Sequence, residues 1–150
     1  MKLIFKLLIG AGALPLLYVC GSFAYLTAKT GKTPFQTAHA AEFAAAGTLS
    51  ESDVATRLAK DSGDPVAHCA LAEKAHKRKD FAKAIAERKL ALLREPENPQ
   101  ILFDTALDLM LAKSNDEAKI YCQKIIETRD PNLTSIAQKM LAKLEKVSPK

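Results

Sequence analysis

From residue 48 onward, hydrophobic residues recur every three or four positions, and charged residues fill the positions between them. The clearest stripe comprises Ile136, Ala137, Met140, Leu141 and Leu144. This spacing is typical of helices that bury one face and expose the other, so it predicts an all-α domain. The six predicted helices cover residues 50–62, 65–78, 81–95, 99–112, 116–129 and 133–146.

Three short polar side chains, Asp64, Asn98 and Asn132, are spaced by 34 positions. Proline follows the first two, as Pro65 and Pro99. An Asp or Asn just before a helix accepts hydrogen bonds from free backbone N–H groups, and proline is favoured at the first helical position. The spacing therefore predicts three equivalent helix starts in a repeated unit.

The residues between these starts also match at this spacing. The matching pairs are His68 with Leu102, Leu71 with Thr105, Ala72 with Ala106, Ala75 with Leu109, Ala84 with Ala118, and Ala91 with Ile125. Over residues 65–131 the pattern resembles the tetratricopeptide repeat, in which small residues occupy the contacts between two antiparallel helices. The residues that carry the resemblance are Leu71, Ala72, Ala75, Phe81, Ala84, Ala91 and Pro96, then Ala106, Leu109, Ala118 and Ile125. His68 and Arg88 depart from it, since aromatic residues are usual there.

The resemblance implies a short α–α superhelix of about six helices over residues 48–150. Its whole repeats would cover residues 65–98 and 99–132, with a half-repeat at each end. The half-repeats bring the stack to the roughly three repeats that such a fold needs for stability. The last helix would then act as a cap.

In this family the first helix of each repeat lines an inner groove that holds a partner. The implied lining residues are Cys69, Glu73, His76, Lys77, Phe103, Leu107 and Met110. Cys69 and Glu73 stand where the family has the Lys and Asn that grip a C-terminal carboxylate, which disfavours that ligand. Phe103, Leu107 and Met110 would hold an apolar or helical peptide, unless the capping helix covers them.

Residues 7–26 form an uncharged apolar run of twenty residues, LLIGAGALPLLYVCGSFAYL. A helix of this length spans about 30 Å, the thickness of the hydrocarbon core of a bilayer. The run predicts a single transmembrane helix in an anchor region of residues 1–32, followed by a connector over residues 33–47. Two alternatives stay open: cleavage near Ala40, which would give a secreted domain, and acylation of Cys20.

The distribution of charge bears on partners and orientation. Of the net charge of +5, little belongs to the helical domain, which has 18 basic and 16 acidic side chains after residue 47. Nucleic-acid binders usually combine a strongly basic face with stacking aromatics, so nucleic acid is not an expected partner. Lysines flank the apolar run equally, and the free amino terminus favours a cytosolic N-terminus, which would put the domain of a bacterial protein in the periplasm.

His68, Cys69, Glu73 and His76 are the residues best suited to metal binding or catalysis. The two histidines would lie about 12 Å apart along a helix, too far to share a metal ion. Cys69 and Glu73 supply only two of the three or four ligands that zinc needs. The sequence shows no Gly-rich phosphate loop and no CxxC spacing. We therefore expect no metal, no cofactor and no enzyme activity.

A basic patch is predicted where the first repeat turns from one helix to the next. It comprises Lys74, Lys77, Arg78, Lys79 and Lys83. Charged residues at this density often form a solvated helical face with ordinary surface ion pairs. The functional interpretation is a binding surface for acidic lipid head groups or for an acidic segment of a partner protein.

These features predict a membrane-anchored protein that mediates protein–protein interaction as a scaffold or assembly factor. Similar anchored tetratricopeptide proteins act in cytochrome c maturation, pilus assembly and translocon quality control. The alternative is a structural accessory subunit of a larger membrane complex, in which the apolar helix packs against other subunits. The small residues that would permit close helix contacts are Gly10, Ala11, Gly12, Ala13 and Gly21.

Overall fold

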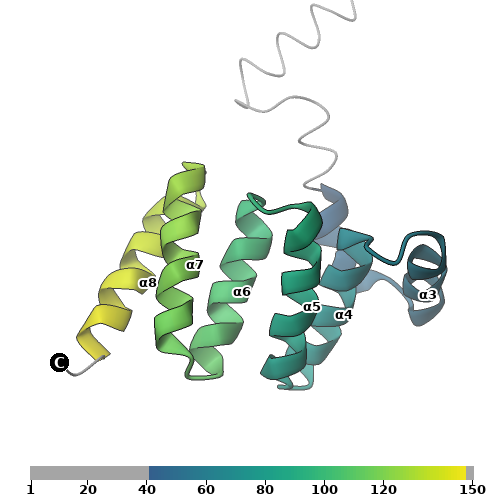
Figure 1. Cartoon of the computed structure of the whole chain (residues 1–150), viewed down its shortest axis with the longest axis horizontal. Coiled ribbons are helices and arrows are strands. Elements are labelled where there is room, and N and C mark those ends of the chain that lie inside the picture. Colours follow the sequence, from purple (N-terminus) through teal and green to yellow (C-terminus); the bar gives the residue numbers. More distant parts are fainter. Residues whose placement is uncertain (1–40, 148–150) are drawn as a thin grey trace, which may run out of the picture. The chain divides into compact units, whose positions relative to one another are not determined.

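The computed structural model describes residues 41–147 of the chain (Figure 1). Residues 41–45 are helical and continue into a short 3-10 helix, η1 (Ala46–Thr48). The α-helices that follow are α3 (Glu51–Lys60), α4 (Pro65–Lys77), α5 (Phe81–Arg94), α6 (Pro99–Leu111), α7 (Asn115–Thr128) and α8 (Leu133–Val147). No strand occurs within the described residues, so the all-α prediction is confirmed for them. Each predicted helix agrees with an observed one to within two residues at either end.

The described residues repeat a helical hairpin with a period of 34 residues. α4 and α5 form the first hairpin, and α6 and α7 form the second. All four helix ends of the second hairpin lie 34 residues after the corresponding ends of the first. Consecutive helices from α4 to α8 pack against each other, and Figure 1 shows them side by side in chain order, with α3 next to α4. The period predicted from Asp64 and Asn98 is therefore also the period of the backbone.

The two hairpins also share the turn that follows their first helix. Lys79 and Lys113, 34 residues apart, have positive φ angles of 62° and 63°. The N–H of the following residue donates to the carbonyl oxygen of Ala75 in the first turn, at 3.0 Å, and of Leu109 in the second, at 2.8 Å. A left-handed residue combined with this hydrogen bond is the Schellman motif that ends many helices. Glycine adopts this conformation without strain, whereas lysine does not.

We therefore expect Lys113→Gly to raise the free energy of unfolding by about 0.5–1 kcal/mol, because glycine removes the strain of the left-handed conformation. Urea unfolding followed by circular dichroism measures this. Gln123→Gly, an exposed position inside α7, is the control and should lower the free energy of unfolding by about 1 kcal/mol. Equal losses in both variants would contradict the assignment of strain to Lys113.

Side-chain caps begin helices α3 to α6, whereas Ser114 before α7 makes no capping hydrogen bond, and one predicted cap is wrong. Asp64 and Asn98 cap α4 and α6 as predicted, by accepting hydrogen bonds from backbone N–H groups of the first turn. At α8 the cap is Asp130 and not Asn132, since Oδ1 of Asp130 accepts from the N–H groups two and three residues later, at 2.9 and 3.0 Å. Asp130 directly precedes Pro131, so the Asx–Pro pair determines this start rather than the 34-residue spacing.

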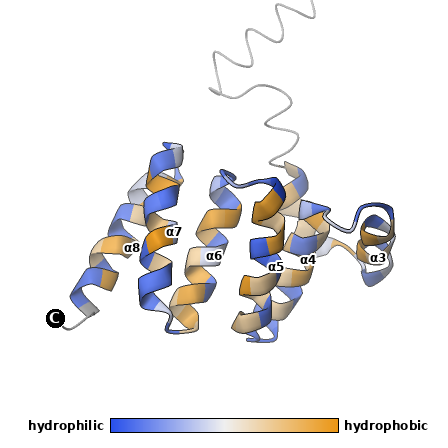
Figure 2. Cartoon of the chain, viewed as in Figure 1, coloured by the Kyte–Doolittle hydropathy of each residue, from blue (hydrophilic) through white to orange (hydrophobic). Residues whose placement is uncertain are grey.

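Two clusters of buried side chains hold the helices together. The first consists of Phe43, Ala46, Val54, Val66, Ala67, Cys69, Ala70, Ala91 and Ile101. The second consists of Leu102, Ala106, Leu109, Ala118, Tyr121, Cys122, Ile125, Ala137 and Leu144. Figure 2 shows that helices α4 to α8 each carry both hydrophobic and hydrophilic residues. The amphipathic pattern of the sequence thus places its apolar stripes between helices.

The folded unit begins earlier than the predicted boundary at Thr48. Phe43 and Ala46, which the sequence prediction places in the connector, are buried in the first cluster. η1 packs on α4, and the backbone of Gly47 lies so close to it that a Cβ there would be 2.9 Å from Cγ of Glu73. The end of the predicted connector is therefore part of the helical domain.

The predicted transmembrane helix, residues 7–26, lies outside the described residues, as do Cys20 and Ala40. Within residues 41–147, no helix combines the length and hydrophobicity needed to cross a bilayer. The longest helix there, α8, has 15 residues, whereas a span needs about 20. The anchor region and the processing alternatives remain sequence predictions.

Candidate functional site

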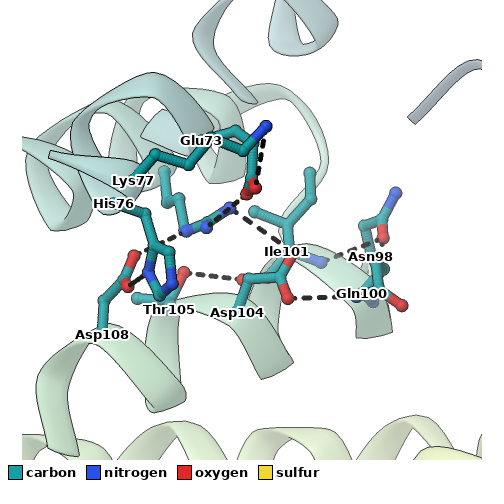
Figure 3. A network of polar contacts seen from close by, with 10 residues as sticks. Glu73, His76, Lys77, Asn98, Gln100, Ile101, Asp104, Thr105 and Asp108 are labelled. Carbon is teal, nitrogen blue, oxygen red and sulfur yellow. Dashed lines mark hydrogen bonds and ion pairs between the residues drawn. The ribbon is translucent and has the colours of Figure 1, made fainter. Parts of the chain in front are cut away.

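A network of charged side chains around Arg88 joins α4, α5 and α6. Figure 3 labels its acidic members Glu73, Asp104 and Asp108. Arg88 extends from α5, and its side chain is only 4% exposed. Its Nε lies 2.8 Å from Oδ2 of Asp108, its Nη1 3.4 Å from Oδ2 of Asp104, and its Nη2 3.6 Å from Oε2 of Glu73. The two aspartates lie on α6 and Glu73 lies on α4, so one guanidinium group joins three helices.

His76 and Lys77 complete the network from α4. Nδ1 of His76 donates to Oδ1 of Asp108 at 2.5 Å, and Nζ of Lys77 lies 3.7 Å from Oε1 of Glu73. The side chain of Asp108 is fully buried, and both of its oxygens accept a hydrogen bond, one from Arg88 and one from His76. Neither Arg88 nor Asp108 has a buried side-chain nitrogen or oxygen without a partner. A buried unpaired charge lowers stability, so these contacts offset the free-energy cost of burying Arg88 and Asp108.

Burial and neighbouring charges act in opposite directions on Arg88 and Asp104. Burial alone would lower the pKa of Arg88, but Asp104 and Asp108 outweigh it and raise that pKa above its ordinary value. Burial raises the pKa of Asp104 above its ordinary value of 3.8, and the attraction of Arg88 offsets only part of this effect. Arg88 therefore keeps its charge, whereas ionisation of Asp104 is less favourable in the folded protein than in the unfolded chain.

We expect Asp104→Asn to raise the free energy of unfolding at pH 7. A carboxyl group with a raised folded pKa stabilises the fold fully below its unfolded pKa of 3.8, and this contribution is lost as the pH rises through the folded pKa. The variant removes the ionisation that causes the loss, and its amide oxygen can still accept from Arg88. Urea unfolding at pH 7 and at about pH 3 measures the gain, which should shrink at the lower pH.

Asp108→Asn is the matched control for that variant. It should lower the free energy of unfolding at pH 7 by about 3 kcal/mol or more, because it removes a fully buried charge that faces Arg88. If Asp104→Asn and Asp108→Asn lowered the free energy of unfolding equally at pH 7, the predicted opposite effects of these two substitutions would be refuted.

The predicted groove residues on α4 do not share one environment. Glu73, His76 and Lys77 lie together in the Arg88 network. Cys69 is instead buried in the first cluster. Burial raises the pKa of its thiol to about 12, so the thiol is protonated at neutral pH and unreactive. Of the predicted lining on α4, only the polar part is open to a partner.

The predicted groove residues on α6 are only partly accessible. Phe103 and Met110 are half-buried and pack against the second cluster, to which α8 contributes Ala137 and Leu144. Leu107 is the most open of the three, with 36% of its surface exposed. Of these three predicted residues, Leu107 is therefore the one that a partner could contact without displacing the core.

The structure divides the predicted basic patch between two places. Lys77 belongs to the Arg88 network, whereas Lys74, Arg78 and Lys83 line a cavity between α3, α4 and the start of α5. The cavity has a volume of about 380 Å³. Lys79 occupies the left-handed position at the end of α4. The residues of the patch thus have three different structural roles.

The centre of the charged network was not predicted from the sequence. In the sequence Arg88 stands where the repeat family usually has an aromatic residue, and no motif marks Asp104 or Asp108. A signal was present, because Arg88 lies on the face of α5 that also carries Ala84 and Ala91, both fully buried. A charged residue within a buried stripe requires partners from other helices.

His68, considered above as a metal ligand, is a hydrogen-bonded residue of the helix packing. Its Nδ1 lies 2.8 Å from Oε2 of Glu87 on α5, and its Nε2 lies 3.0 Å from the carbonyl oxygen of Ser62. Because a carbonyl oxygen only accepts, Nε2 carries a hydrogen. His68 and His76 therefore bond to separate partners. Within residues 41–147 no group of three or more ligating side chains is arranged to hold a metal ion.

Two comparisons with known proteins identify no relative. No protein-family model matches the chain, and a search of curated proteins gives no match.

Proposed function

We propose that the chain is a membrane-anchored protein-interaction module of the tetratricopeptide type, a scaffold or assembly factor without catalytic activity. The observation that carries the proposal is the 34-residue repeat of the hairpins α4–α5 and α6–α7. Stacked hairpins bring helices from different parts of the chain into one extended surface, which repeat proteins use for binding. The membrane part of the proposal is supported by the apolar run of residues 7–26.

The Arg88 network supports the proposal because it fixes α4 and α6, the first helices of the two hairpins, relative to each other. His76 on α4 and Asp108 on α6 are bonded directly, and Arg88 contacts carboxylates of both helices. A surface that is already ordered loses less conformational entropy when a partner binds. Leu107 precedes Asp108 on α6 and is partly exposed, so an apolar partner side chain could pack there.

A second candidate, a structural accessory subunit, is favoured by a different observation. Large apolar side chains are exposed on the second helices of the hairpins, namely Leu90 and Leu93 on α5 and Ile120 on α7. Permanent interfaces bury such residues against other subunits. In this case the partner would cover α5 and α7 and remain bound throughout the life of the complex.

Purification of the full chain in a non-ionic detergent, followed by mass measurement of what co-purifies, separates these functions. The interaction module predicts a partner that is lost with Leu107→Glu and retained with Leu93→Glu. The accessory subunit predicts a stoichiometric complex that survives high salt and is lost with Leu93→Glu or Ile120→Glu. A chain that stays free of bound protein in every case would refute both.

Deletion of residues 1–40 tests the anchor and leaves Phe43 in the core. We expect the truncated chain to move from the membrane fraction to the soluble fraction, because it lacks the apolar run. Circular dichroism confirms that the truncated chain is still helical. If localisation did not change, the anchor would be refuted while the interaction surface would still stand.

A further inference from the structure

The cavity beside α3 combines an apolar floor with a basic rim. Val54 and Leu58 of α3 and Leu71 of α4 form part of its floor, and Lys74 and Lys83 lie at its edge. Val54 is buried, whereas Leu58 and Leu71 are only partly covered. α3 packs mainly against α4. No further helix of the described residues completely covers the apolar floor of the cavity at this end of the helical row.

The basic side chains at the rim are not neutralised within the described part of the chain. Lys74 and Lys83 form no ion pair among residues 41–147. Arg78 has one contact, 4.0 Å from Glu51 across the groove, between side chains that are both mostly exposed. Such pairs contribute roughly 0–1 kcal/mol and open readily. Asp80, the other acidic residue at the rim, already accepts from the backbone N–H of Lys83 as the cap of α5.

We propose that this groove, bordered by Lys74, Arg78 and Lys83, binds an acidic amphipathic segment of a partner protein. One or two bulky apolar side chains of the segment enter between Leu58 and Leu71, and its carboxylates pair with the three basic residues. This proposal depends on the proposed function in one respect, that the domain binds a protein. The groove is a second binding surface, separate from the surface at Leu107.

The size of the cavity favours side chains of a peptide as its occupant. Its volume of about 380 Å³ lies at the lower end of the roughly 300–1,000 Å³ that is usual for ligand sites. An apolar floor recessed between two helices matches side chains that project from a folded or extended segment. A planar membrane surface would contact the lysines but leave the floor unfilled, so charge alone does not account for the site.

The test uses the full chain in non-ionic detergent micelles and a fluorescein-labelled helical peptide made of glutamate and alanine, with leucines along one face. Fluorescence anisotropy measures binding, with empty micelles as the blank. We expect saturable binding that is at least ~10-fold weaker when serine replaces the leucines or lysine replaces the glutamates, because both apolar and charged contacts contribute. Equal binding of the serine peptide would overturn the proposal, since it would show charge attraction only.

Two pairs of variants locate the binding. Lys74→Glu with Lys83→Glu should weaken it at least ~10-fold, whereas Lys139→Glu with Lys143→Glu, which makes the same change in net charge on α8, should leave it within about twofold. Ala55→Trp should fill the groove and weaken binding similarly, whereas Ala59→Trp, exposed on α3 outside the cavity, should not. Circular dichroism confirms that each variant folds. Equal losses within either pair would overturn the assignment of the site.

Vesicles containing phosphatidylglycerol provide the remaining comparison. If the chain bound these vesicles through Lys74 and Lys83 but did not bind the leucine-containing acidic peptide, the surface would be a lipid site and the proposal would be overturned. Failure at this groove is distinguishable from failure of the proposed function, because the loss of a co-purifying partner with Leu107→Glu does not depend on the groove.

Discussion

Replacement of Arg88 by alanine is expected to lower the free energy of unfolding by about 3–5 kcal/mol, because it leaves a fully buried carboxylate without its cation. Asp108 would keep only His76 as a partner, while Glu73 and Asp104 would face each other across the vacated space. Urea unfolding at pH 7, followed by circular dichroism, measures the loss.

Arg94→Ala is the matched control on the same helix. Arg94 is mostly exposed and pairs with Asp61 at 3.5 Å, so its replacement should cost no more than about 1 kcal/mol. A double-mutant cycle of Arg88→Ala with Asp108→Ala should give a coupling energy within about 0.5–3 kcal/mol, because the second change removes the charge that the first leaves unpaired. Similar losses for Arg88→Ala and Arg94→Ala would show that the network does not hold α4, α5 and α6 together.

Leu109→Ala is expected to lower the free energy of unfolding by about 2–5 kcal/mol, because it opens a cavity in the second cluster. Leu109, on α6, is 1% exposed and belongs to the second cluster, to which α7 and α8 also contribute. The same substitution at Leu93, which is 77% exposed, should change stability by no more than about 0.5 kcal/mol. Thermal or urea unfolding of both variants measures the difference.

Equal effects at these two leucines would mean that the apolar stripes are not buried as the structure places them. The comparison is sharp because the chemistry of the two substitutions is identical and only the burial differs. A loss at Leu109 together with an unchanged Leu93 would confirm that the hairpins are held by side chains between the helices.

Helix positions could be predicted from the sequence because their signals are local. Asp64 and Asn98 each precede a proline, and the side-chain contacts that cap α4 and α6 reach only two or three residues along the chain. The 34-residue period adds a second constraint, since the two hairpins must have equal lengths for it to hold. The cap predicted at Asn132 is wrong, because Asp130, which directly precedes Pro131, caps α8 instead.

The binding surfaces were harder to predict because they depend on which side chains meet in space. Arg88 and Asp108 are 20 residues apart, and only the packing of α5 on α6 brings them together. The basic patch is continuous along the chain but is divided by the helical geometry, which directs Lys74 to the α3 groove and Lys77 to Glu73. Cys69 was predicted to line the groove but is buried, because α4 is covered on that side by the first cluster.

We expect the surface built by α4 and α6 to hold a partner protein, and photo-crosslinking can detect that contact. A benzoylphenylalanine replaces Leu107, on α6, in the full chain expressed in its native host, and Gln123 on α7 is replaced as the control. We expect a discrete protein adduct from position 107 that is absent from position 123. No adduct at position 107, or the same adducts from both positions, would contradict it.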